Sequence, residues 1–80
     1  MDFESIEVES YSGYKANERP EKFEYQESLY RVIEITDRWY EGGYISGRPV
    51  IRYYKVKTES EDQFLVRYDP AADEWSAKPV

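Results

Sequence analysis

The sequence predicts an all-β domain, an antiparallel meander of five to six strands curled into a roll or a small open barrel. Three observations carry this prediction. Short stretches rich in β-branched and aromatic residues alternate in polarity, and glycine, proline, asparagine and aspartate separate them. No stretch has the length and period of a three-turn helix. Either an SH3-like or an OB-like winding fits these observations.

The length of the chain allows one small domain, which can bury only a limited apolar area. Eighty residues bury only about 60% of the surface that the unfolded chain exposes. The chain has no cysteine, so disulfides cannot reinforce the core, and nine Tyr, three Phe and two Trp must supply the buried area. Within this single domain, residues 1–80, we expect the ends at 1–4 and 78–80 to fray and 41–49 to form a flexible loop.

One long strand, residues 28–40 with the sequence SLYRVIEITDRWY, stands at the centre of the prediction. Its apolar residues do not keep one parity. A β-bulge near Val32 and Ile33 would turn them toward one core, whereas burial on both faces of a regular strand is the alternative. With the bulge, the core-facing residues would be Tyr30, Val32, Ile33, Ile35 and Trp39. The exposed row would be Arg31, Glu34, Thr36, Arg38 and Tyr40.

Shorter strands are expected on both sides of this one, because alternation of polarity resumes there. Tight turns at residues 26–28, 58–62 and 69–73 connect some of them. In the two strands after the central one, the parity of Tyr54 and Phe64 is expected to face inward, which turns Leu65 and Arg67 outward. The shorter strands are expected at residues 5–11, 22–26, 50–57, 63–68 and 74–77.

Charge is distributed unevenly along the chain. The net charge is −6, but residues 28–57 carry three acidic and six basic side chains, whereas residues 1–27 carry eight against three and residues 58–80 six against two. The overall sign disfavours nonspecific attraction to nucleic acid. The basic middle leaves one surface on which such binding is conceivable.

Several segments together resemble a family of small uncharacterised bacterial domains. The similar pattern covers residues 18–76: ERPEKFEYQESLYRVIEITDRWY, then RYYKVKT, FLVRYD and the late Trp75. Some similar domains are found beside translesion DNA polymerases, so the resemblance implies a context of DNA maintenance by association. The family has no activity from which functional residues could be transferred to this chain.

A candidate interaction face follows from the predicted strands, because adjacent strands would present cations and rings together. Such a face could bind single-stranded nucleic acid through phosphate contacts and base stacking. The alternative is that these cations pair across strands with carboxylates while the rings fill the core. The candidate face consists of Arg31, Arg38, Tyr40, Tyr53, Lys55, Leu65 and Arg67.

No catalytic, cofactor or metal signature is present in the sequence. Asp37 and Arg38 are adjacent, but successive strand residues point to opposite faces. The TESED turn at residues 58–62 lacks the spacing and glycine of a calcium-binding EF-hand loop, which favours a solvated turn. The glycine-rich residues 41–47 have no following helix that would complete a phosphate site.

We therefore expect a non-enzymatic interaction module without cofactor, metal or small-molecule substrate. It would bind a protein partner or self-associate through the outer face of its sheet, and an accessory domain that binds single-stranded nucleic acid is the alternative. No apolar run approaches the roughly 20 residues of a membrane span, and the N-terminal residues are acidic. With no cysteine, these features lead us to expect a cytoplasmic protein without membrane contact.

Overall fold

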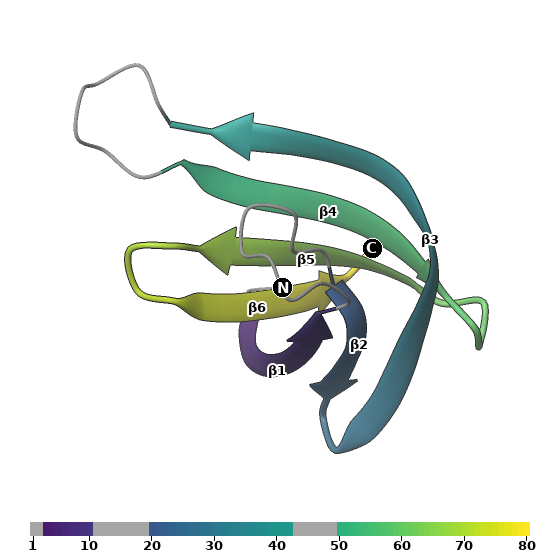
Figure 1. Ribbon diagram of the computed structural model, residues 1–80. Helices are drawn as coiled ribbons and strands as arrows, with labels where there is room; N and C mark the ends of the chain where they lie inside the picture. Colours follow the sequence, from purple (N-terminus) through teal and green to yellow (C-terminus); the bar gives the residue numbers. More distant parts are fainter. Residues whose placement is uncertain (1–2, 11–19, 43–49) are drawn as a thin grey trace.

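A computed structural model describes residues 3–10, 20–42 and 50–80. Six antiparallel strands follow one another around a closed barrel, and the last strand pairs with the first (Figure 1). The predicted all-β meander is confirmed. The strands are β1 (Glu4–Ser10), β2 (Pro20–Tyr25), β3 (Ser28–Glu41), β4 (Ile51–Thr58), β5 (Gln63–Asp69) and β6 (Glu74–Pro79).

The winding of the barrel is sequential, because every strand pairs with its neighbours in the chain. An OB fold has a Greek-key order, so this barrel does not have the OB-like winding. Its closure is uneven. β1 pairs with β6 only over Glu4–Ile6, and β2 pairs with β3 only over residues 28–31. The rest of β3 pairs with β4 alone, and Figure 1 shows this end of the β3–β4 ribbon reaching past β1 and β2.

β3 contains two bulges, of which the sequence predicts one. Val32 lies opposite Thr58 while Glu34 lies opposite Lys57, so Ile33 is the extra residue of the predicted bulge. The ladder shifts again between residues 35 and 37, where Thr36 is the extra residue. Each extra residue bends the strand and reverses the side-chain phase beyond it.

The two bulges correct the predicted core row of β3. Tyr30, Val32 and Ile35 pack against the core as expected. Ile33 is 56% exposed, because the inward positions on either side of the bulge belong to Val32 and Ile35. Trp39 is 38% exposed, because the second bulge places it opposite Tyr53 on the outside of the barrel.

Aromatic rings fill the core where β1 and β2 close the barrel. The ring of Phe64 lies 5.1 Å from that of Phe23, 5.1 Å from that of Tyr25 and 4.8 Å from that of Tyr30, measured between centroids. Val56 and Val66 beside them are fully buried. Burial raises the pKa of Tyr25, and the nearby Glu4 carboxylate raises it further.

The β2–β3 turn is the expected tight turn, and it is built from unusual residues. Gln26 and Glu27 have φ values of 50° and 66°, the left-handed conformation that a two-residue type I′ hairpin requires at both positions. Asparagine and glycine normally occupy such positions, because a Cβ atom is crowded there. The Gln26 amide donates a hydrogen bond to the Glu4 carboxylate at 3.2 Å.

The two other predicted turns are present. In the 58–62 turn, Thr58 is fully buried, and its Oγ1 accepts a hydrogen bond from the Asp62 amide at 3.1 Å. Ser60 Oγ donates to Asp62 Oδ2 at 2.7 Å. No group of three or more potential metal-binding side chains occurs among the described residues. In the 69–73 turn, Asp69 Oδ1 accepts a hydrogen bond from the Ala71 amide at 3.0 Å.

The ends of the described chain are tied into the barrel. Glu4 pairs with Ala77, and Lys78 and Pro79 belong to β6. Fraying at 1–4 and 78–80 stays a prediction. The Val80 amide donates to the Gln63 carbonyl at 3.0 Å. Glu41 ends β3, and residues 43–49 of the predicted flexible loop lie outside the described residues. None of the described segments forms a helix that could span a membrane.

Candidate interaction surfaces

The β-ladder brings four of the seven predicted face residues together on the outside of the barrel. Tyr53 lies opposite Arg67, and Lys55 lies opposite Leu65, on the outward faces of β4 and β5. All four are half-buried. Opposite residues of an antiparallel pair share a face, so these side chains form one continuous surface.

Two further cations extend this surface. Lys57 has the same outward parity as Lys55, and Lys78 lies opposite Leu65 on the neighbouring strand β6. The sequence places Lys57 among the cations of these strands, but the prediction does not include Lys78. We call the surface the outer basic face and define it by Tyr53, Lys55, Lys57, Leu65, Arg67 and Lys78.

Carboxylates border the outer basic face but do not form close ion pairs with it. Asp37 lies opposite Lys55 and Glu34 opposite Lys57 across the β3–β4 ladder. Among the described residues, however, no carboxylate oxygen lies within 4.0 Å of either lysine nitrogen, so neither lysine makes an ion pair. The cross-strand pairing that the alternative interpretation expects is therefore only a loose association of charges, which is worth little at an exposed position.

Rings also lie on this outward side. The rings of Trp39 and Tyr53 stack with a centroid separation of 5.3 Å and an interplanar angle of 7°. The Phe3 ring lies 6.3 Å from the Tyr53 ring, and the Lys78 ammonium lies 5.1 Å from the Phe3 ring. The Tyr53 hydroxyl donates to Glu41 at 2.9 Å. These contacts hold Tyr53 in place at the edge of the outer basic face.

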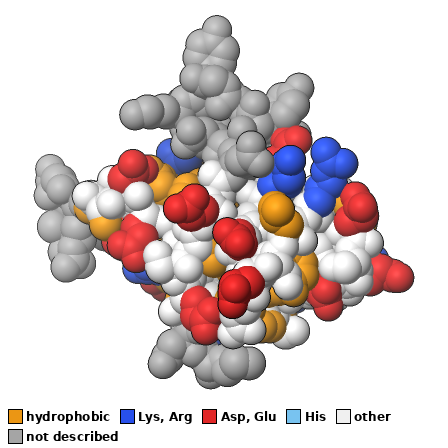
Figure 2. Space-filling model, turned by 90° about the horizontal axis from the view of Figure 1, so that it is seen from below, with side chains coloured by type: hydrophobic (Ala, Val, Ile, Leu, Met, Phe, Trp, Pro, Cys, Tyr) orange, Lys and Arg blue, Asp and Glu red, His pale blue; other side chains and the backbone are white. Residues whose placement is uncertain are grey.

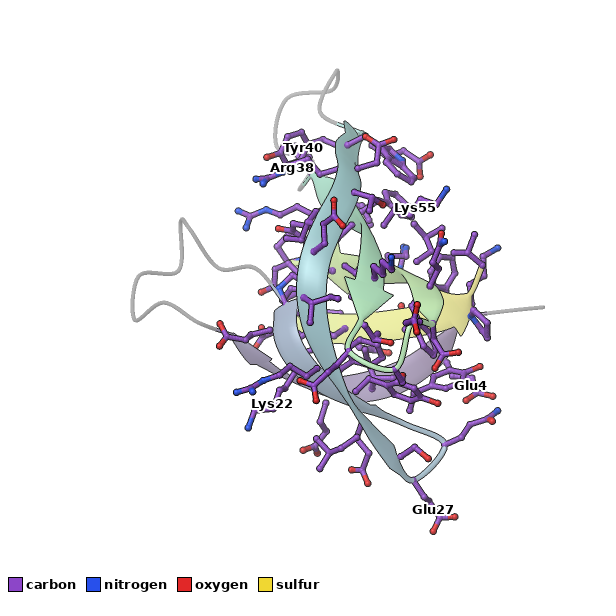
Figure 3. The ribbon with its side chains drawn as sticks, turned by 90° about the vertical axis from the view of Figure 1, so that its right-hand side faces the viewer. Glu4, Lys22, Glu27, Arg38, Tyr40 and Lys55 are labelled. Atoms are coloured by element: carbon purple, nitrogen blue, oxygen red, sulfur yellow. The ribbon has the colours of Figure 1, made fainter. Side chains whose placement is uncertain are left out.

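The other three predicted face residues lie elsewhere. Arg31 is opposite Lys22 in the β2–β3 hairpin, beyond the end of β4. Arg38 is opposite Tyr54, whose side chain is 4% exposed and faces the interior, so Arg38 belongs to the inward register. Tyr40 shares that register. In Figure 3, Arg38 and Tyr40 point to one side of the β3–β4 ribbon and Lys55 to the other.

The inward register at the open end of the barrel contains a row that the sequence prediction does not identify. Tyr40 lies opposite Arg52, Arg52 opposite Tyr68, and Tyr68 opposite Trp75, across four successive strands. We call these four residues the inner arginine–aromatic row. They could not be grouped from the sequence, because the second bulge decides on which face Tyr40 lies.

Contacts along the inner arginine–aromatic row are close. The Tyr68 and Trp75 rings are 4.6 Å apart, and the Arg52 guanidinium lies 6.0 Å from the centre of the Tyr68 ring. The Tyr68 hydroxyl donates to Asp73 at 2.8 Å. Tyr40 at the end of the row is 62% exposed, and the other three members are half-buried.

An acidic surface covers the opposite part of the barrel. Glu7 and Glu24 lie directly opposite each other on β1 and β2, and Glu24 also lies opposite Leu29. Figure 2 views this side and shows acidic side chains across its middle, with a pair of basic ones toward the upper right. A shallow pocket of about 290 Å³ opens here, lined by Glu7, Val8, Lys22, Phe23, Glu24 and Leu29. We call Glu7, Glu24 and Leu29 the acidic face.

One edge of β3 has no strand partner among the described residues, but it is poorly suited to pairing with a further strand. From residue 33 onward, β3 has no strand partner on the side away from β4 among the described strands. An unpaired edge can add a strand from another chain. Here two bulges interrupt the edge, and the Arg38 amide donates at 2.8 Å to the side chain of Asp37. Strand addition is therefore disfavoured at this edge.

Comparisons with known proteins add no further assignment. No protein-family model matches the chain, and no curated protein or solved structure matches it significantly. The resemblance to small bacterial domains stays a prediction.

Proposed function

We propose that this protein is a non-enzymatic interaction module that self-associates, with the outer basic face of one copy docking on the acidic face of another. The observation that carries this proposal is the segregation of charge on the outside of the barrel. Cations gather over β4, β5 and β6, whereas Glu7 and Glu24 face each other on β1 and β2.

The outer basic face has the composition of a docking surface. Leu65 lies at its centre, directly opposite Lys55 on one side and Lys78 on the other. A half-buried aliphatic side chain surrounded by cations can exclude water from charge pairs that form around it. The lysines are free of ion pairs within the described chain, so an acidic partner would not have to displace an existing one.

The acidic face supplies the complementary features. Like charges directly opposite each other on a sheet are unfavourable by some tenths of a kcal/mol. A cation placed between Glu7 and Glu24 would remove this repulsion. Leu29 is 72% exposed beside them and could cover Leu65 of the docked copy. The pocket of about 290 Å³ has room for the end of a lysine side chain.

The two surfaces differ, so the contact would be head-to-tail. Such contacts leave one unused surface of each kind at the ends and continue to grow unless they close into a ring. The association would depend strongly on salt, because exposed charges are screened over about 8 Å at physiological ionic strength.

The proposal includes the absence of catalysis and a cytoplasmic location. The sequence has no histidine or cysteine, so general acid–base chemistry would fall to carboxylates. Glu7, Glu24, Glu34 and Asp37 are exposed on the outside of the barrel. A chain without cysteine has no disulfide bond that a reducing compartment could break.

Sedimentation velocity tests the proposal directly. We expect species heavier than the 9.6 kDa chain in 20 mM salt and monomers in 500 mM salt. Lys55→Glu disables the outer basic face and Glu24→Lys disables the acidic face, so each variant alone should be monomeric. Mixed in equal amounts, each variant supplies the intact surface that the other lacks, and a dimer that grows no further should form.

A charge-matched control distinguishes docking from a change in net charge. Glu59→Lys changes an exposed turn residue by the same two charges as Glu24→Lys, and it should associate like the wild type. Monomeric wild-type protein at low salt would contradict the proposal. So would a mixture of the two variants that stays monomeric.

A further inference from the structure

The inner arginine–aromatic row has a composition that the proposed self-association does not use. It lies on the inward register of β3 to β6, whereas the outer basic face lies on the outward register of β4 to β6. Trp75 packs against the core cluster, whereas Tyr40 and Arg52 take no part in it. A long cation and an exposed ring at the end of a hydrophobic core therefore call for a separate explanation.

We propose that this row binds a short segment of single-stranded nucleic acid. Aromatic side chains presented by a sheet stack on unpaired bases, and arginines beside them contact the phosphates. The inward register supplies both groups. Tyr40 offers a largely exposed ring, and Trp75 offers a half-buried one at the other end of the row.

Two arginines lie at the exposed end of the row. Arg52 stands between Tyr40 and Tyr68 in the ladder, and Arg38 lies two residues before Tyr40 on the same face of β3. Neither arginine makes an ion pair among the described residues. The row itself contains no carboxylate, and Asp73 accepts the Tyr68 hydroxyl hydrogen.

The chemistry of the row favours this ligand over an acidic protein. The outer basic face presents mainly lysines around an aliphatic residue, and a lysine ammonium is a compact point charge that has no plane to stack on a base. Arginine next to tyrosine suits a ligand that is at once anionic and aromatic. Guanidinium planes and rings both stack on bases, and a guanidinium can contact a phosphate through two hydrogen bonds.

The two tryptophans of the chain provide a reporter for each face. Trp75 belongs to the inner row, and Trp39 stacks on Tyr53 on the outward side. Trp39→Phe leaves Trp75 as the only indole, and Trp75→Phe leaves Trp39. Titration of each variant with an unlabelled 8-nucleotide oligo(dT), in 500 mM salt to suppress association and again in 20 mM salt, should quench Trp75 and leave Trp39 unchanged.

The affinity for a fluorescently labelled oligo(dT) of the same length, measured at several salt concentrations, shows how many phosphate contacts are made. Two phosphate contacts predict that log K falls with log salt with a slope of about −1.4, at about −0.7 per contact for single strands. Arg52→Gln should halve that slope. Tyr40→Ala should weaken binding by about tenfold, within the range for losing one stacked base. Arg67→Gln, on the outer basic face, is the matched control and should bind within twofold of the wild type.

Several results would overturn the proposal. Absence of binding in 20 mM salt is one of them, and equal quenching of Trp39 and Trp75 is another. A larger loss of affinity in Arg67→Gln than in Arg52→Gln would assign the oligonucleotide to the outer basic face instead, and equal losses would contradict binding by the inner row alone. Circular dichroism of Arg52→Gln and Arg52→Lys checks folding; Arg52→Lys should keep the salt slope while losing affinity.

Discussion

The two faces of the β3–β6 sheet surround their cations with different neighbouring side chains. On the outer face, Lys55 lies between Asp37 and Leu65 in the ladder, next to a carboxylate and an aliphatic side chain. On the inner face, Arg52 lies between Tyr40 and Tyr68. The neighbours that the register provides, more than the cations themselves, determine which ligand each face suits.

The inner face itself changes character along its length. Where β1 and β2 cover it, Phe23 and Phe64 are packed ring against ring and are nearly inaccessible. Beyond that cover, Arg52 and Tyr68 of the same register are half-buried and Tyr40 is exposed. Coverage by two short strands thus separates the aromatic residues of the core from the more accessible row that we propose as a binding surface.

The largest effect is expected in the covered half. Phe64→Ala removes the ring that contacts three others, and it should lower the free energy of unfolding by about 3–5 kcal/mol. Leu65→Ala, one residue further and half-buried on the outer face, should cost about 1 kcal/mol. Urea denaturation in 500 mM salt, where association is suppressed, measures both. Equal costs would contradict the assignment of the two registers.

The next effect concerns the independence of the two faces. Lys55→Glu should abolish self-association while changing oligonucleotide affinity in 500 mM salt by less than twofold, because its side chain lies across the sheet from Arg52. Arg52→Gln should weaken oligonucleotide binding by about tenfold and leave sedimentation unchanged. A variant that impairs both functions while remaining folded would show that the faces are coupled.

A smaller gain is expected at the β2–β3 turn, which lies beyond the acidic face. Replacing Gln26 and Glu27 together with Asn and Gly relieves two left-handed positions and should raise the free energy of unfolding by about 1 kcal/mol. Thermal and urea unfolding measure this gain. Replacing Ser60 and Glu61 with Asn and Gly serves as a comparison, since only Glu61 has a positive φ at that turn. A larger gain in the free energy of unfolding there would argue against the type I′ explanation.

The smallest effect concerns pH. The pKa of Tyr25 in the folded chain lies above its ordinary value of 10.0, chiefly because of burial. A raised pKa means that the folded state holds the proton longer, so this contribution to stability is fully present below pH 10.0 and is lost as pH rises through the folded-state pKa. Tyr25→Phe keeps the ring and should make unfolding less sensitive to pH above 10.0, where the unfolded tyrosine loses its proton first. An unchanged pH dependence would exclude Tyr25 as its source.

Regular alternation made part of this molecule predictable from sequence. In β4 and β5 the alternation is unbroken, so the inward Tyr54 and Phe64 and the outward Leu65 and Arg67 could all be assigned correctly. The first bulge of β3 could also be predicted, because its apolar residues change parity there. The strand order followed from the short turns.

The rest depended on features that one strand cannot encode alone. Nothing in the sequence around Thr36 marks it as the extra residue of a second bulge; the shift is seen only in the pairing of β3 with β4. That single residue moves Arg38 and Tyr40 inward and Trp39 outward. The candidate face predicted from sequence therefore combines residues from opposite sides of the sheet.

One measurement tests most directly whether the two faces act separately. Fluorescently labelled oligo(dT) is sedimented with an excess of the chain in 20 mM salt, and the label and the protein are followed at different wavelengths. Because the faces lie on opposite sides of the sheet, we expect the label to travel with the self-associated species, whose size distribution stays as it is without oligonucleotide. If the oligonucleotide instead dissociates these species into monomers, the oligonucleotide and the second copy of the chain compete for one surface, and the assignment of two faces is wrong.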